Sequence, residues 1–143
     1  MKKLLLGQSV EGCGAVGLLI LRLVTGAAFI FHGWPKIQHA FSWMGPDAFA
    51  PSWLQGLAAF AEFGGGIALV IGLLTAIASL GIMCNMIVAI STVHVPHGDP
   101  FVSMKGGRSW ELAAVYLAIV ILLILFGPGK YSLDKVVFGK GKS

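Results

Sequence analysis

The sequence predicts an all-α protein, an antiparallel four-helix bundle that spans a membrane. Of the 143 residues, 57% are hydrophobic and 11% are charged, and the mean hydropathy is +0.87. A soluble chain of this length cannot bury so many apolar side chains in one core. Four apolar runs, at about residues 14–34, 52–74, 76–94 and 110–126, each have about the length that crosses a hydrocarbon core of about 30 Å. We expect residues 1–143 to form a single domain.

The first run has a helical face of small and polar residues. Arg22, Gly26, Phe29 and Gly33 lie at offsets of four, seven and eleven residues, which place them on one side of a helix. The two glycines would let a neighbouring helix come close. Pro35 follows directly, and a proline ends or kinks a helix.

The other runs have clear boundaries. Ser52 and Gln55 match a capping box, which predicts a helix start near Ser52. Only the uncharged residues 74–76 separate the second run from the third, so these two helices should form a tight antiparallel hairpin. The fourth run stops at Gly127, in the sequence Gly-Pro-Gly.

The charge pattern predicts the orientation. The formal net charge is +4, but the basic residues are spread over connections and termini and form no patch for nucleic acid. With four spans both chain ends lie on the same side of the membrane, and most lysines are near them. The positive-inside rule then places both termini in the cytoplasm. The terminal lysines are Lys2, Lys3, Lys130, Lys135, Lys140 and Lys142.

Three polar residues are expected near the membrane midplane. Glu62 lies ten residues past Ser52, about 15 Å from the outer edge by helical rise. Arg22 lies about 12 Å from the inner edge, and Asn85 lies at a similar height. An ionised side chain at this depth costs about 2.5 to 3.5 kcal/mol unless it is paired. The sequence therefore predicts one cluster of Arg22, Glu62 and Asn85.

Two interpretations of this cluster remain open. The first is a structural polar clamp that fixes the register of the helices. The second is a site for a small polar or redox-active molecule, or a carboxylate that accepts a proton. No nucleophile with an adjacent base and no phosphate-binding glycine loop is visible in the sequence.

A second polar layer is expected near the outer face, as an entrance or ligand-binding region. Its members are His32, Lys36, His94, His97, Arg108 and Glu111, with Tyr116 somewhat deeper. Two histidines on different helices are the ligands of a b-type haem, but no motif marks that chemistry, and we do not expect one. His94 and His97 lack diagnostic metal-ligand spacing, so no metal site is expected either. Cys13 and Cys84 form no CxxC motif, and we expect no disulfide.

Taken in order, these residues resemble the DoxX family of small four-helix membrane proteins, and the match covers almost the whole chain. The residues that carry it are Arg22-Leu23 with Gly26, Phe29, Gly33 and Lys36; Glu62 with Gly65-Gly66 and Gly72-Leu73-Leu74-Thr75; His94, Phe101, Gly106-Gly107 and Glu111; and Gly127-Pro128-Gly129-Lys130-Tyr131-Ser132-Leu133-Asp134. The resemblance implies a multi-pass protein of the bacterial inner membrane. It also implies a link to redox chemistry, because relatives look like the small subunit of a thiosulfate:quinone oxidoreductase or are connected with quinone or catechol detoxification.

The leading hypothesis is a quinone-linked or thiol-linked redox role, with a soluble redox enzyme as the partner that supplies the catalytic centre. The cofactor stays open, and a quinone is the candidate. Arg22, Glu62 and Asn85 would bind or orient a polar head group or carry a proton, and the outer layer would form the entrance. The alternative is a non-enzymatic membrane scaffold or a small-molecule carrier. A carrier of this size would need to form a homo-oligomer.

Overall fold

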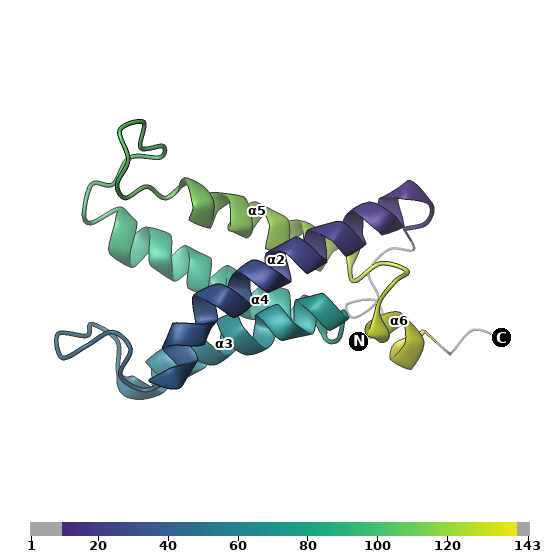
Figure 1. The fold of residues 1–143 in the computed structure, drawn as a ribbon, viewed down its shortest axis with the longest axis horizontal. Helices are drawn as coiled ribbons and strands as arrows, with labels where there is room; N and C mark the ends of the chain where they lie inside the picture. Colours follow the sequence, from purple (N-terminus) through teal and green to yellow (C-terminus); the bar gives the residue numbers. More distant parts are fainter. Residues whose placement is uncertain (1–9, 140–143) are drawn as a thin grey trace.

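The computed structural model describes residues 10–139, and all regular elements of this part of the chain are helices (Figure 1). The all-α prediction is therefore confirmed for these residues. Lys2, Lys3, Lys140 and Lys142, on which the predicted orientation partly rests, lie outside them. In chain order the elements are α2 (Cys13–Gln38), α3 (Ser52–Ile71), α4 (Thr75–Val88), the π-helix η1 (Ala89–His94), α5 (Glu111–Phe126) and α6 (Leu133–Phe138).

Within residues 10–139, three helical segments are long and apolar enough to cross a membrane. They are α2, α3, and α4 together with η1, which form one segment of 20 residues. Helix α5 is also apolar, but it has only 16 residues. Large apolar side chains stay exposed along all of these helices, among them Val24, Phe31, Phe60 and Leu125. Such a surface suits contact with lipid tails rather than with water.

Consecutive helices pack against each other, α2 on α3, α3 on α4, and α4 on α5 (Figure 1). Helices α2 and α3 come closest at their glycines. A Cβ atom on Gly26 would lie 2.7 Å from the carbonyl oxygen of Gly66, and one on Gly33 would lie 2.5 Å from the nitrogen of Phe63. The close approach predicted for Gly26 and Gly33 is confirmed, and it sets Gly33 level with Phe63.

One helix end and one helix cap differ from the predicted ones. Pro35 does not end the first helix, because α2 continues to Gln38. The start of α3 at Ser52 is as predicted, but no capping box forms there. The N-cap residue is Pro51, and no side chain caps the helix. The side chain of Gln55 bonds instead to the loop that precedes α3.

The segment after α5 folds back against the turn between α3 and α4, and we call residues 127–138 the C-terminal latch (Figure 1). The carboxylate of Asp134 accepts hydrogen bonds from the backbone nitrogens of Leu74, at 2.7 Å, and Thr75, at 2.9 Å. Leu74 has a φ of 50°, an uncommon value for a leucine. Asp134 thus supplies the acceptor for the first backbone N–H groups of α4 and stabilises the strained turn.

Candidate functional site

Glu62 is a buried carboxylate in the middle of α3, with 4% of its surface exposed. Its Oε1 atom lies 2.7 Å from Nζ of Lys36. Lys36 reaches it because α2 continues past Pro35, which keeps Lys36 in the last helical turn beside α3. The ammonium of Lys36 also lies 4.5 Å from the centre of the Trp43 ring, in the loop between α2 and α3. A cation over an aromatic face is attracted to it.

Asn85 of α4 lies beside the same carboxylate, as the depth arithmetic predicts. Its Nδ2 atom donates to the carbonyl oxygen of Ala58 at 2.9 Å and lies 3.5 Å from Glu62 Oε1. The second oxygen of Glu62, Oε2, is buried and has no hydrogen-bond partner among the described residues. An unpaired buried acceptor is costly, so Oε2 is suited to accept a hydrogen bond from a bound molecule.

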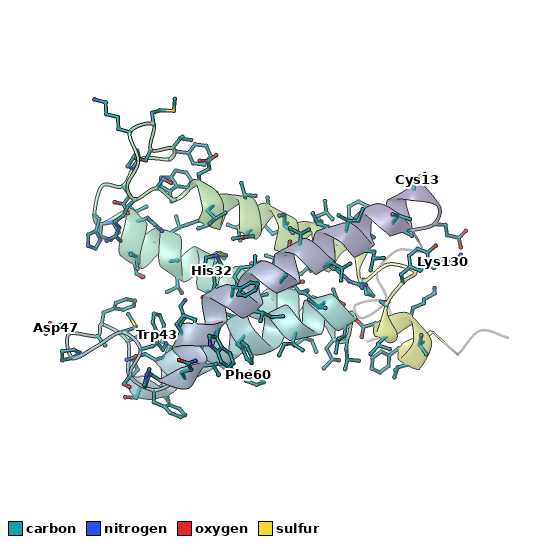
Figure 2. The ribbon with its side chains drawn as sticks, viewed as in Figure 1. Cys13, His32, Trp43, Asp47, Phe60 and Lys130 are labelled. Carbon is teal, nitrogen blue, oxygen red and sulfur yellow. The ribbon has the colours of Figure 1, made fainter. Side chains whose placement is uncertain are left out.

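These polar groups line a pocket of about 510 Å³ between α3, α4 and the loop before α3. Apart from them the walls are almost entirely apolar. Figure 2 shows Trp43 and Asp47 at the loop end of α2 and α3, where the loop covers the pocket. The lining residues are Lys36, Trp43, Met44, Phe49, Ala50, Leu54, Gln55, Leu57, Ala58, Ala61, Glu62, Ile77, Leu80, Gly81, Cys84, Asn85, Val88, Ala89 and Val93.

The predicted pairing of Arg22 with Glu62 is wrong. Arg22 is buried and donates Nε to the carbonyl oxygen of Leu69 at 3.2 Å, Nη2 to that of Tyr131 at 2.8 Å, and Nη1 to that of Pro128. Arg22 lies beside Leu69, seven residues further along α3 than Glu62, because α2 begins well beyond the C-terminal end of α3. It therefore holds the C-terminal latch and takes no part in the pocket.

The predicted outer layer is divided among separate places. The ring of His32 packs against Phe29 of the same helix, at a ring-centre distance of 6.3 Å, and edge-on against Tyr116 of α5, at 6.2 Å. His94 Nδ1 bonds to Asp99 at 2.8 Å, and Arg108 Nε bonds to the same carboxylate at 3.2 Å. Glu111 is exposed at the start of α5. Within the described part of the chain, Lys36 is the one member of this layer that lines the pocket.

The Asp99 contacts predict a pH-dependent loop. Burial raises the pKa of this carboxyl, but the His94 hydrogen bond and the charges of Arg108, His94 and His97 outweigh it and hold the pKa below the ordinary 3.8. A carboxyl with a lowered pKa in the folded state stabilises the fold above its unfolded-state pKa and loses that effect as pH falls through its folded-state pKa.

We therefore expect the protection factors for hydrogen exchange in residues 95–110, which are corrected for the pH dependence of the intrinsic exchange rate, to fall once the pH falls below about 4. The corresponding Asp99→Asn protein should have lower protection factors already at neutral pH, with little further change on acidification. Equal pH dependence in the two proteins would show that Asp99 does not hold the loop.

Sequence reasoning missed several groups of the pocket, namely Trp43, Gln55, Cys84 and the pairing role of Lys36. For Lys36 the sequence offers one signal of this role, because Lys36 is the first lysine or arginine after the apolar run 14–34. The other three come together only through the packing of α3 on α4 and the shape of the loop. Both cysteines are free and exposed. Cys84 lines the pocket, whereas Cys13 is the first residue of α2, at the end of that helix away from Trp43 (Figure 2).

All regular elements of residues 10–139 are helices and include three that can cross a membrane, with a buried carboxylate in an apolar pocket between two of them, which defines a polytopic membrane protein. The family model for DoxX matches residues 17–95, more than half of the sequence, and the chain belongs to the DoxX family. It is similar to the inner membrane protein YqjF of Escherichia coli (strain K12), with 28% identity over 128 residues that cover 85% of this chain and 92% of that protein. No solved structure matches.

Proposed function

We propose that this protein binds the ring of a lipid-soluble quinol in the Glu62 pocket and takes part in quinone-linked redox chemistry of the membrane. One observation carries the proposal. A buried carboxylate oxygen, Glu62 Oε2, has no hydrogen-bond partner among residues 10–139, and Glu62 lines an apolar pocket of about 510 Å³. Such a site suits a molecule with a large apolar surface and a few polar atoms.

The polar groups of the pocket fit the reduced, hydroxyl-bearing form of such a ring. Glu62 Oε2 is a hydrogen-bond acceptor, so it suits a ligand that donates a hydrogen bond. The side-chain nitrogen of Asn85 donates a hydrogen bond to the carbonyl oxygen of Ala58, so the side-chain oxygen of Asn85 remains as a second acceptor. A ring that carries hydroxyl groups donates to both, whereas a ring that carries only carbonyl oxygens does not. The Lys36 ammonium pairs with the other oxygen of Glu62, Oε1, at 2.7 Å.

A quinol supplies two electrons and two protons when it is oxidised. The residues of this chain bind and orient the ring, exclude water from it with apolar walls, and accept one of the two protons at Glu62. A soluble redox enzyme would receive the two electrons and the second proton, and this protein would be the membrane subunit of the pair. A homo-oligomer is compatible with the small size of the chain.

We further propose that α5 is the fourth span, so that the four helices form one antiparallel bundle in the bacterial inner membrane with both termini in the cytoplasm. The printed name of the relative YqjF, an inner membrane protein, and the lysines near the ends of the chain support this placement. The latch also supports it, because Asp134 joins the segment after α5 to the α3–α4 turn at one end of the helices.

The test is an ultraviolet-visible spectrum of the gently solubilised, purified protein, with mass spectrometry of its solvent extract. We expect the extract to contain the quinol, which is an aromatic diol, or the corresponding quinone, in an amount that scales with the amount of protein extracted. The same preparation of Glu62→Gln should lack it. An extract free of such rings, together with a soluble protein that copurifies in equal amount, would favour the scaffold. Flux of a small molecule across vesicles without net redox would favour the carrier.

A further inference from the structure

Gln55 anchors the loop between α2 and α3. It is 3% exposed and lies in the first turn of α3. Its Oε1 atom accepts from the backbone nitrogen of Met44 at 3.1 Å, and its Nε2 atom donates to the carbonyl oxygen of Ala50 at 2.9 Å. Its own carbonyl oxygen accepts from Nε1 of Trp43 at 3.0 Å. One buried residue therefore ties down both ends of the segment 43–50.

This segment, which we call the roof, covers the loop end of the pocket. Trp43, Met44, Phe49 and Ala50 all line the pocket from above the helix ends. The loop just before the roof lies close on α3, because a Cβ atom on Gly56 would lie 2.6 Å from the ring of Phe41. The roof stands between the pocket and the water at this end of the helices.

The sides of the pocket have a different character. Leu57 of α3 and Ile77, Leu80 and Val88 of α4 line the pocket and are exposed. These residues lie on two helices that are long and apolar enough to cross a membrane. An exposed apolar side chain on such a helix faces lipid. The pocket is thus open toward the bilayer between α3 and α4, where Cys84 also lies exposed.

We propose that Gln55 is a positioning residue that keeps the roof closed to water, so that the ligand reaches Glu62 from the bilayer between α3 and α4. The inference builds on the ligand site proposed above and adds the route to it. The roof also carries Trp43, whose ring lies against Lys36, the partner of Glu62. Closing the roof therefore holds the charged groups of the site in place as well as excluding water.

The two cysteines provide the test in the full-length protein in lipid vesicles, since peptide mass spectrometry separates Cys84 from Cys13. We expect a neutral, membrane-permeant maleimide to label Cys84 readily in wild type, and a charged, water-soluble thiosulfonate to label it slowly. Gln55→Met preserves the size of the side chain and removes its two hydrogen bonds. The substitution should raise the rate at which the charged reagent labels Cys84 by at least about tenfold, as expected for two lost hydrogen bonds. The labelling rate of Cys13 should stay unchanged. The control is Gln38→Met, which changes the same residue type at the end of α2 and should behave as wild type.

The outcomes separate this inference from the proposed function, because labelling needs no ligand. Equal charged-reagent rates at Cys84 in wild type and Gln55→Met, in a folded protein, would overturn the roof. If the variant failed to fold, the wild type would still decide. Fast labelling of wild-type Cys84 by the charged reagent would mean that the pocket is open to water, and fast labelling by the neutral reagent alone would support access from the lipid. A protein that passes these tests yet binds no quinol would overturn the ligand and leave the route intact.

Discussion

The Arg22→Met protein is expected to lose about 3 to 5 kcal/mol of its free energy of unfolding, because removing one member of a buried charged network leaves the others unsatisfied. Arg22 is 1% exposed and donates to three backbone carbonyl groups, those of Leu69, Pro128 and Tyr131. Methionine fills a similar space but donates to none of them. Asp134, which is fully buried, would also lose its nearby positive charge.

The measurement is unfolding in detergent, followed by circular dichroism, with limited trypsin cleavage at Lys130 and Lys135 as a local probe of the C-terminal latch. Cleavage there should become faster in the variant because the latch loses two of its anchors. The control is Lys130→Met, which removes a positive charge from an exposed side chain of the same segment and leaves cleavage at Lys135 as its trypsin readout. A loss below about 1 kcal/mol, the value typical of an exposed charge, would show that Arg22 does not hold the latch.

Replacing Glu62 by glutamine is expected to weaken quinol binding by about 10- to 100-fold, which corresponds to one hydrogen bond to a charged group. Glutamine keeps the size of the side chain but removes the charge that pairs with Lys36 and the acceptor of greatest strength. Its amide nitrogen also brings a donor to a place where the ligand donates. Binding is measured by quenching of tryptophan fluorescence, since Trp43 lines the pocket.

Two controls distinguish this effect from general damage. Glu111→Gln makes the same chemical change at an exposed position outside the pocket and should leave the affinity unchanged. The dimethyl ether of the same quinol has the ring but no hydroxyl donor, so it should bind weakly to the wild type and be insensitive to Glu62→Gln. Equal affinity of wild type for the quinol and its ether would contradict the role assigned to Glu62 Oε2.

The parts of the fold that follow from local sequence were predictable. Apolar runs set the helices, and Ser52 marked the start of α3. The glycine face of α2 predicted a close helix contact, and Gly26 and Gly33 do lie against α3. The level of Asn85 relative to Glu62 also followed from helical rise, because α3 and α4 form a hairpin whose short turn leaves little freedom.

Contacts that depend on chain segments far apart in sequence were not predictable in the same way. Arg22 was assigned to Glu62 because the depth estimate placed the ends of every helix at the two membrane edges, whereas α2 begins well beyond the end of α3 at which Leu69 lies. Its actual partners include the carbonyl oxygens of Pro128 and Tyr131, more than 100 residues away. The position of Lys36 depended on Pro35 leaving α2 intact, and the roof depended on Gln55 bonding to a loop instead of capping its own helix.

The most direct test of the Glu62 site is whether a short-chain quinol protects Cys84 from the neutral maleimide, with Cys13 in the same molecules as the reference. Cys84 lines the pocket and Cys13 does not. We predict that the quinol slows labelling of Cys84 alone, that its dimethyl ether does not, and that Glu62→Gln removes the protection. Unchanged labelling of Cys84 at saturating quinol, or equal protection by the ether, would contradict a quinol site at Glu62.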